Sequence, residues 1–326
     1  MKLFVLSLII SFQSARALEQ IRFDDYVGTY QKQYNNYIEY QQKQLIFHEN
    51  VKRIEELREE HPDLEFAMNE FGDFTMEEFH ANMKGFRPSL LHRTKQCNMY
   101  AYQESDVPSA WDWRSQGAVA SVKNQGQCGS CWSFSAAGAM EGSWAISTGN
   151  LVNISEQQLM DCSTKYINFG CNGGEMDHAF EYAIDNGMCL DDEVPYTAES
   201  SSCDDSEKAC TKVATFTSCE DIQTKDQVAM EEASHFAPLS VAIEADTTVF
   251  QFYSGGVLNS DKCGTNLDHG VLVVGYGSED DQDYWIVKNS WGDSWGEDGY
   301  IRIAKSSSTN DDGVCGIAMQ PSLIKV

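Results

Sequence analysis

The chain has 326 residues, 42% of them hydrophobic, and a formal net charge of −27 at pH 7. This length suffices for one large domain or two modest domains with a buried core. The acidic balance argues against nucleic acid and anionic membrane surfaces as partners. It is explained either by a solvated acidic surface or by a protein that works at acidic pH, where carboxylates lose their charge.

The N-terminus predicts a secretory signal peptide over residues 1–17. Lys2 precedes the apolar run Leu3–Ile10, and Ala15 and Ala17 supply small residues for a cleavage site. A buried N-terminal helix is the alternative. The apolar run is too short to span a bilayer, and no other segment comes close, so we expect no membrane span.

Secretion would place the 11 cysteines in oxidising conditions, which predicts a disulfide framework rather than a set of metal ligands. Because the count is odd, at least one thiol should stay unpaired. The chain also contains one N-glycosylation sequon, Asn153-Ile154-Ser155, so we predict a glycan at Asn153.

Residues 18–96 contain no cysteine and carry a helical pattern. Aromatic and apolar residues recur at helical spacing between Phe23 and Tyr34, and a second helix is predicted from Ile38 to Glu60, ended by Pro62. The pattern alone is also compatible with an ordinary helical bundle domain. The polar residues 97–106 predict a linker.

The remainder, residues 107–326, changes from a helical half at about 107–215 to a strand-rich half at about 216–326. A mostly apolar helix is predicted at 132–148, and Ser155 is expected to cap the next helix. Glycine, aspartate and serine turns separate four β-rich runs, which are Leu239–Ile243, Val271–Val274, Tyr284–Val287 and Tyr300–Ile303. We therefore expect an α+β fold.

The stretch Cys128-Gly129-Ser130-Cys131 has three interpretations. A redox pair would normally lie in a thioredoxin-like βαβ pattern, which is not evident around it. A zinc site would need a second pair of ligands at suitable spacing, and none is clear. The third interpretation is a nucleophilic cysteine beside a structural one.

A cysteine nucleophile needs a stabilised thiolate and a proton acceptor. Cys131 lies at the start of the predicted 132–148 helix, where the dipole favours an anion. His269 begins an apolar strand, Asn289 can orient an imidazole, and the Gln125 side chain can donate, together with the Cys131 backbone N–H, to an oxyanion. Taken singly, these three residues would be assigned to the core, a turn and a surface loop, so the combination carries the prediction.

Seven motifs surround these residues: DWR at Asp112–Arg114, QGQCGSCW, SEQQLMDC, CNGG, LDHGVLVVGYG, YWIVKNSWGDSWGEDGYIRI and CGIA. In this order they resemble the papain-like cysteine peptidases, close to the cathepsin L type. His269 follows Cys131 by 138 residues and Asn289 follows it by 158, close to the spacing of that family. The resemblance covers nearly the whole chain after the signal peptide. It implies a papain-like two-domain fold, with a helical left domain and a β-barrel-like right domain, preceded by a helical prodomain.

The resemblance also implies roles for single residues. Cys131 would be the nucleophile, His269 its partner, Asn289 the orienting residue and Gln125 the oxyanion donor, with Trp291 shielding the His269–Asn289 hydrogen bond from water. In the resting enzyme Cys131 and His269 would form a thiolate–imidazolium ion pair, and the reaction would pass through a thioester. Catalysis would need no metal and no cofactor. The substrates would be proteins and peptides, and because no insertion resembles an exopeptidase's blocking loop, we expect an endopeptidase.

The same resemblance implies three disulfides, Cys128–Cys171, Cys162–Cys203 and Cys263–Cys315. The sequence leaves Cys97, Cys189, Cys210 and Cys219 open; an added Cys189–Cys210 bond and a free Cys219 are compatible with it. Substrate-binding positions implied by the family are Gly173, Gly174, Glu175, Met176, Ala242, Leu267, Gly270 and Gln320. The middle of this pocket is apolar, whereas Glu175 and Gln320 would either admit a polar or basic side chain or face solvent.

Residues 18–106 resemble the inhibitory propeptide of cathepsin L-type enzymes, which leaves residues 107–326 as the peptidase domain. The spacing of the ERFNIN helix is found in Glu39, Lys43, Phe47, Asn50, Ile54 and Arg58, with two departures at Lys43 and Arg58. The second propeptide motif is found at Ala67–Asp73, with Ala67 in place of the usual leading glycine. We expect acid to release the propeptide by protonating carboxylates such as Asp73.

These features predict an acid-activated cysteine endopeptidase zymogen of the secretory pathway, located in lysosomes or outside the cell. Its expected partners are its own propeptide and cystatin-type inhibitors, and we expect a monomer. Two other classes remain open: an inhibitor protein that uses residues 18–106, and a thiol–disulfide oxidoreductase that uses Cys128 and Cys131. Alkylation separates the last class, because an oxidoreductase would expose two reactive thiols and a peptidase one.

Overall fold

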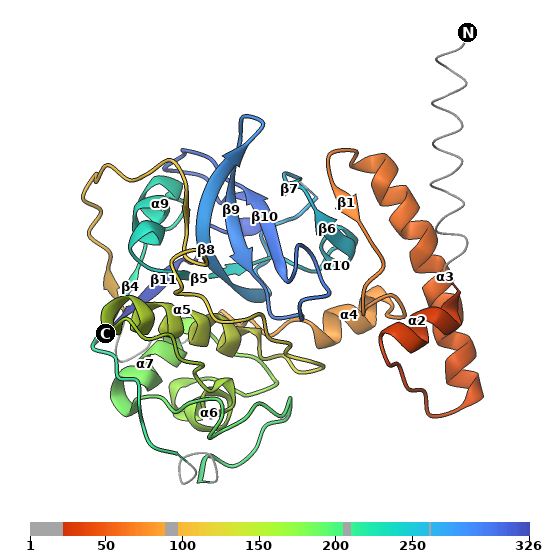
Figure 1. Cartoon of the computed structure of the whole chain (residues 1–326), viewed down its shortest axis with the longest axis horizontal. Coiled ribbons are helices and arrows are strands. Elements are labelled where there is room, and N and C mark those ends of the chain that lie inside the picture. The colour runs from red at the N-terminus through yellow and green to blue at the C-terminus, as the bar shows by residue number, and fades with distance from the viewer. Residues whose placement is uncertain (1–21, 89–96, 205–209, 261) are drawn as a thin grey trace.

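The structure is a computed structural model that describes residues 22–88, 97–204, 210–260 and 262–326 (Figure 1). The predicted signal peptide, residues 1–17, lies outside this part of the chain. Within the described ranges, no helix combines the length and apolar character that crossing a membrane would require.

The N-terminal part contains helices α2 (Phe23–Thr29), α3 (Tyr37–Glu60) and α4 (Met76–Asn82) and the short strand β1 (Glu65–Phe66). Helix α3 begins where the Asn36 side chain accepts hydrogen bonds from the backbone N–H groups of Ile38 and Glu39. Its inner face buries Phe47, Val51, Ile54 and Leu57. Helix α2 is shorter than its aromatic pattern predicts, because Gln31 adopts a left-handed φ of 51° soon after it.

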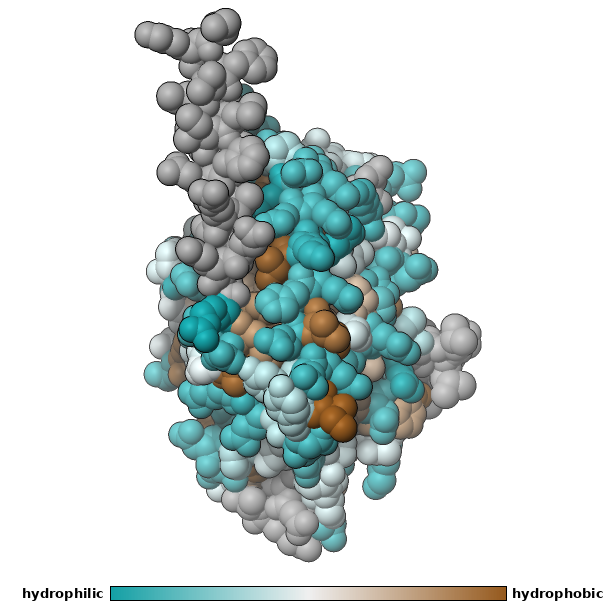
Figure 2. Space-filling view, turned by 90° about the vertical axis from the view of Figure 1, so that its right-hand side faces the viewer, coloured by the Kyte–Doolittle hydropathy of each residue, from teal (hydrophilic) through white to brown (hydrophobic). Residues whose placement is uncertain are grey.

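Helices α2 and α3 lie at the right of the molecule in Figure 1, and α4 lies between them and the centre of the molecule, on the side toward α5. The face turned outward there is mostly hydrophilic, with hydrophobic residues standing apart from one another (Figure 2). Three of the most exposed hydrophobic residues are on α3: Tyr37 is 71% exposed, Ile38 69% and Leu45 66%. Scattered apolar side chains of this kind are normal for a solvated surface.

The helical lobe is built from α5 (Cys131–Thr148), α6 (Glu156–Cys162) and α7 (Met176–Asn186), with a 3-10 turn at Ser163–Tyr166. Helix α5 is almost entirely buried and contacts both the other helices and strand β8. The predicted cap of α6 is confirmed, because Ser155 Oγ accepts a hydrogen bond from the Gln158 N–H.

The second lobe is a nine-stranded sheet with helix α9 (Gln227–Phe236) and helix α10 (Thr248–Phe252) against it. The central strands β5 (Leu239–Ile243), β8 (His269–Glu279), β9 (Gln282–Lys288) and β10 (Tyr300–Ala304) run antiparallel to one another, and β10 pairs in parallel with β7 at its other edge. The outer strands are β2 (Asn98–Met99), β4 (Ser218–Asp221), β11 (Ser322–Lys325) and β7 (Val257–Leu258), and β3 (Trp111–Asp112) pairs with β8. Strand β6 (Tyr253–Gly255) pairs with β1, and a 3-10 turn lies at Val314–Gly316.

Two segments do not follow the predicted division of the chain into a linker, a helical half and a strand-rich half. Strand β3 precedes the helical lobe in the chain, yet it pairs with β8 of the sheet. Residues 97–106 were predicted to be a linker, and this was wrong: β2 pairs in parallel with β4, and the residues after it bind the Glu232 carboxylate. Their polar composition gave no sign of this pairing, because two-residue strands leave no periodic pattern.

Candidate active site

Cys131 is the first residue of helix α5 and is fully buried. Its Sγ accepts a hydrogen bond from the Gly270 N–H at 3.3 Å. Ten of the 11 cysteines form disulfides, and Cys131 alone has a free thiol. The thiol therefore lies at a helix N-terminus and accepts a hydrogen bond from the main chain. The residue that donates this bond, Gly270, directly follows His269 in the chain.

His269 begins β8, and Asn289 directly follows the last residue of the neighbouring strand β9. The antiparallel pairing of these strands brings the two side chains together, with His269 Nε2 2.8 Å from Asn289 Oδ1. Because an amide oxygen only accepts, Nε2 carries the proton. Nδ1, the other ring nitrogen, has no hydrogen-bond partner among the described residues. It is left as the acceptor on the side of the ring remote from Asn289.

Burial sets the protonation of this pair in the structure. It raises the pKa of the Cys131 thiol to about 12, against the opposing hydrogen bond from the Gly270 N–H. It lowers the pKa of His269 to about 4, although the hydrogen bond to Asn289 acts in the other direction. Both shifts favour a neutral thiol and a neutral imidazole near pH 7 in the proenzyme, which differs from the thiolate–imidazolium pair that the resemblance implies, because burial disfavours both charges.

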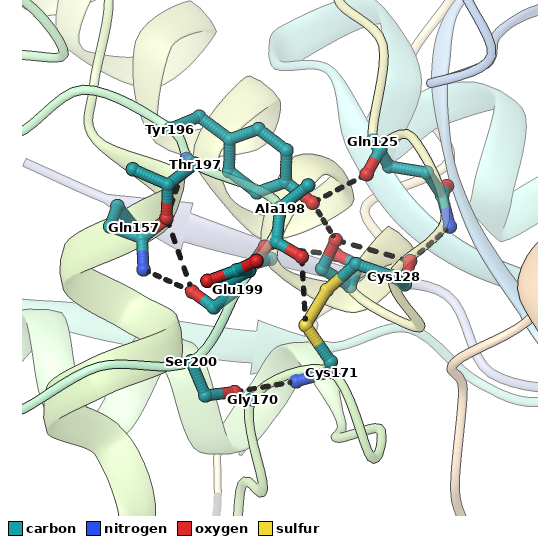
Figure 3. Close-up of a disulfide and its surroundings, with 12 residues drawn as sticks. Gln125, Cys128, Gln157, Gly170, Cys171, Tyr196, Thr197, Ala198, Glu199 and Ser200 are labelled. Atoms are coloured by element: carbon teal, nitrogen blue, oxygen red, sulfur yellow. Dashed lines mark hydrogen bonds between the residues drawn. A yellow bond between two sulfur atoms is a disulfide. The ribbon is translucent and has the colours of Figure 1, made fainter. Parts of the chain in front are cut away.

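Gln125 is fully buried, and four hydrogen bonds fix its position, one of them from its N–H to the Ser290 carbonyl at 2.8 Å. Its Nε2 donates to the Cys128 carbonyl at 2.9 Å, and its Oε1 accepts from Ser290 Oγ at 2.7 Å. The Tyr196 hydroxyl donates to the Gln125 carbonyl at 2.6 Å (Figure 3). One proton on Nε2 remains beyond the bond to Cys128, in the loop that leads into Cys131.

The Cys128–Cys171 disulfide joins this loop to the glycine-containing loop opposite it (Figure 3). The Gly129 N–H also donates to the Cys171 carbonyl at 3.1 Å. Because Cys128 is bonded to Cys171, Cys128 and Cys131 do not form a redox pair, and the Cys128 sulfur is not available to a zinc ion.

The other pairings add to the sequence prediction and correct it. The remaining implied bonds, Cys162–Cys203 and Cys263–Cys315, are present, and so is Cys189–Cys210. The sequence left a free Cys219 open, but Cys219 is paired with Cys97. No spacing rule could have revealed this bond, because its partner is 122 residues away and belongs to the segment predicted as a linker.

Trp291 covers the His269–Asn289 pair. Its side chain is buried, and its ring lies 4.7 Å from the His269 ring. From the N-terminal part, Phe71 and Phe79 approach Trp291 edge-on at 5.6 and 5.2 Å. The aromatic layer over the histidine is thus completed by residues far away in the sequence.

Residues after α4 run through the cleft beside Cys131. The N–H groups of Gly85 and Phe86 donate to the Asp268 carbonyl, at 3.1 and 3.0 Å. On the other side, the Gly174 N–H donates to the Gly85 carbonyl at 2.9 Å, and the Arg87 N–H donates to the Gly174 carbonyl at 3.0 Å. The chain is therefore held from both lobes by main-chain hydrogen bonds, as an extended peptide would be.

Gly85 has no room for a side chain. A Cβ atom there would lie 2.1 Å from the Gly129 carbonyl oxygen. Phe86 is buried in the cluster that contains Met176, Ala242 and Leu267, three of the implied pocket residues. Sequence reasoning did not single out Gly85 or Phe86, because their role depends on the cleft that they enter.

Glu175 and Gln320 meet at the polar end of this pocket. The Gln320 Nε2 donates to Glu175 Oε1, and Glu175 Oε2 lies 3.5 Å from Nε2 of the buried His178. Glu175 is buried, so of the two alternatives left open by the sequence, the one in which it faces solvent is wrong. Its carboxylate is already bound within the protein.

A second charged group lies behind the site. Lys123 pairs with Glu156 at 2.7 Å and with Glu141 at 3.3 Å, and both carboxylates are buried. Burial lowers the pKa of Lys288, which precedes Asn289 in the chain. These four residues and Asn289 line one small cavity. Sequence reasoning missed this cluster, since single charged residues far apart in the chain give no motif.

This constellation, a helix-start cysteine beside an imidazole fixed by an asparagine with a peptide segment of the same chain across it, defines a cysteine protease zymogen. The model of the Papain family cysteine protease matches residues 107–324, and that of the Cathepsin propeptide inhibitor domain (I29) matches residues 23–79. The chain therefore belongs to the papain family of cysteine proteases and carries an N-terminal propeptide inhibitor domain.

Relatives from plants and arthropods agree with this. The chain is 43% identical to Cysteine protease XCP2 of Arabidopsis thaliana over 90% of this chain and 83% of the relative. It is 42% identical to Digestive cysteine proteinase 3 of Homarus americanus over 92% of this chain and 93% of the relative. The solved structure of digestive procathepsin L 3 from Tenebrio molitor larval midgut superposes with a TM-score of 0.83 at 41% identity, covering 93% of this chain and 97% of that one.

Proposed function

We propose that this protease cleaves peptide bonds within proteins through Cys131 and His269. The observation that carries the proposal is the single free thiol at the start of α5. Its Sγ accepts from the N–H of Gly270, the residue after His269, whose Nε2 is bound to Asn289 and whose Nδ1 has no partner among the described residues. The relatives named above are themselves proteases, and the prosegment occupies the cleft as an extended peptide.

In the first half of the reaction, His269 Nδ1 takes the Cys131 proton and the thiolate attacks the carbonyl carbon of the substrate. The negative charge moves to the carbonyl oxygen, which accepts hydrogen bonds from the free Gln125 Nε2 proton and from the Cys131 backbone N–H. The intermediate then collapses: the C–N bond breaks, His269 protonates the leaving amine, and a thioester remains.

In the second half, water attacks the thioester carbon while His269 accepts its proton. The C–S bond breaks, Cys131 regains a proton from His269, and the carboxylic acid leaves. Asn289 keeps the ring in one orientation throughout, and Trp291 excludes water from their hydrogen bond. Substrate and one water molecule are the only reactants that these steps add to the groups of the chain.

The prosegment indicates a preference for apolar residues at the position two before the cleaved bond. Phe86 is buried in the same hydrophobic cluster as Met176 and Ala242, Leu267 packs against that cluster, and the Glu175 carboxylate is bound to Gln320. A substrate library should therefore favour Leu, Val or Phe over Arg at this position by about tenfold or more, since an Arg would need to compete for Glu175. Equal cleavage of the Arg and Leu substrates would contradict this preference.

Acid activation is the proposed control. Asp73 is buried and accepts hydrogen bonds from the hydroxyl groups of Tyr26 and Tyr34, both at 2.8 Å, and its carboxylate lies 3.0 Å from Lys32 Nζ. Protonation of this carboxylate would leave Lys32 without its negative partner inside the prosegment. The prosegment would then lose the fold that presents Phe71 and Phe79 to Trp291.

The proposal also covers the cellular context of the protein, on the basis of its N-terminal sequence. We propose a signal peptide at 1–17, passage through the secretory pathway and residence in lysosomes or outside the cell. Asn153 is exposed and so accessible to a glycan. The cleft that holds residues 84–87 would also accept cystatin-type inhibitors, and the protease is proposed to act as a monomer.

Hydrolysis of a fluorogenic Leu-Arg or Phe-Arg peptide by the acidified proenzyme tests the proposal, with Cys131→Ala as the matched variant. Activity should appear as the prosegment is lost and should be absent from the variant. Absence of activity in both proteins after another protease has removed the prosegment would overturn the catalytic assignment. The inhibitor-protein alternative would then be favoured.

A further inference from the structure

Residues Cys97–Asp106, called the strap below, lie on the side of the sheet opposite to α2 and α3 (Figure 1). The strap begins with the Cys97–Cys219 disulfide, whose two cysteines are 7% and 5% exposed. Asn98 and Met99 then form β2, which pairs with Glu220 and Asp221 of β4. The Tyr100 N–H donates to the Asp221 carbonyl at 2.8 Å, so the first four residues continue the sheet of the peptidase.

The Glu232 carboxylate on α9 holds the rest of the strap. One of its oxygens accepts from the Tyr100 hydroxyl and the Gln103 N–H, both at 2.9 Å, and the other accepts from the Ser105 N–H at 2.6 Å. Although burial acts to raise it, these hydrogen bonds hold the pKa of Glu232 below its ordinary value. The carboxylate is thus used fully by the strap.

The prosegment is attached to the peptidase in a different way. Between Phe23 and Arg87 its contacts with the peptidase are hydrogen bonds, ion pairs and side-chain packing, all of which separate on release. At Cys97 the attachment is covalent. A cut after Cys97 would therefore leave the prosegment joined to Cys219 at a high effective concentration beside the cleft that it blocks.

We propose that the strap is a permanent part of the active protease and that the activating cut falls before Cys97. The proposal rests on the function proposed above only in that the prosegment is removed by proteolysis. It shortens the removable segment relative to the 18–106 range expected from the sequence. The strap then closes the edge of the sheet at β4, which would otherwise expose unpaired main-chain groups.

The test is the N-terminus of the activated protein. Proenzyme is acidified until activity is constant, all free thiols are alkylated, and the protein is measured by intact mass with and without reduction and by N-terminal sequencing. We expect one polypeptide that begins before Cys97 under both conditions, and a linked Cys97–Cys219 peptide in the non-reducing digest. A chain that begins after Cys97 with an alkylated Cys219, or a fragment ending in the strap that leaves only on reduction, would overturn the proposal.

A second measurement does not depend on where sequencing finds the N-terminus. The double variant Cys97→Ser, Cys219→Ser is activated and its Tm is compared with that of the activated wild type. If the strap is retained, loss of the bond should lower Tm by about 5–10 °C. Equal Tm values would show that the active protease no longer contains the bond.

The same mapping separates this proposal from the proposed function. The Cys131→Ala proenzyme, digested with pepsin as an added acid protease, should also keep the strap bound to Cys219 after its prosegment is lost. A wild-type protein that has lost its prosegment, keeps the strap and shows no activity would contradict the catalytic assignment alone. Loss of the strap from an active wild-type protein would contradict the present proposal alone.

Discussion

The catalytic residues and the prosegment that covers them are held in contrasting ways. Cys131, His269 and Gln125 are fully buried and are fixed by α5, by adjacent strands and by hydrogen bonds from the peptidase itself. The prosegment enters the same site through main-chain hydrogen bonds at 84–87 and through partly exposed ion pairs such as Lys84–Asp246 at 3.0 Å. Partly exposed ion pairs contribute little individually and weaken when a partner is neutralised.

This difference explains how one chain can be both inhibited and ready to act. The His269–Asn289 hydrogen bond and the bond from the Gly270 N–H to Cys131 Sγ are both made within the peptidase, so we expect them to persist when the prosegment leaves. What the prosegment changes is access and solvation, by adding Phe71 and Phe79 to the layer over Trp291 and by filling the cleft with Gly85 and Phe86.

The largest effect is expected for His269→Ala. Loss of the proton acceptor should lower kcat of the activated protease by about 10⁴-fold, because the thiol is then neither deprotonated nor able to pass a proton to the leaving amine. Steady-state kinetics after prosegment removal by added protease measures it. His48→Ala is the control: His48 is exposed on α3 and leaves with the prosegment, so kcat should not change. A loss below tenfold for His269→Ala would argue against its role.

The reactivity of Cys131 should increase by about 10³-fold when the prosegment leaves. Burial in the proenzyme raises the pKa of the thiol to about 12, so its thiolate fraction at pH 7 is lower than that of an ordinary thiol by this factor. Iodoacetamide labelling rates of the proenzyme and the activated form, both at pH 7, test this. Similar rates would mean that the prosegment blocks substrate without changing the protonation of the thiol.

Gly85→Ala tests how tightly the prosegment fits. The new Cβ would overlap the Gly129 carbonyl oxygen, so the segment must move out of the cleft. Autoactivation of the full-length proenzyme should become about 10–100-fold faster, measured as the appearance of activity at pH 6. Gly28→Ala is the matched control, because a Cβ there meets nothing within 4 Å. Slow activation of both variants would show that the 84–87 contact is not what limits release.

The sequence predicted the catalytic residues better than it predicted the contacts of the prosegment and the strap. Cys131, His269 and Asn289 lie in local motifs whose neighbours form the helix and strands that orient them, and these elements were predicted within a few residues. Glu232, Cys219 and the strap were not predicted, because their contacts join segments more than 100 residues apart and two-residue strands have no period. Phe86 is similar: nothing near it in the sequence shows which pocket it enters.

The smallest effect is expected for Asp73→Asn, which removes the charge facing Lys32 and keeps the size of the side chain. The proenzyme should activate about tenfold faster at pH 7 and show a weaker response to acid, because the charge that acid would neutralise is already absent. Activation rates at pH 4.5 and pH 7 measure both effects. Asp25→Asn, at an exposed position of α2, should behave like the wild type. Equal wild-type rates at the two pH values would show that acid does not act on the prosegment, and an unchanged pH response in Asp73→Asn would move the switch to another carboxylate.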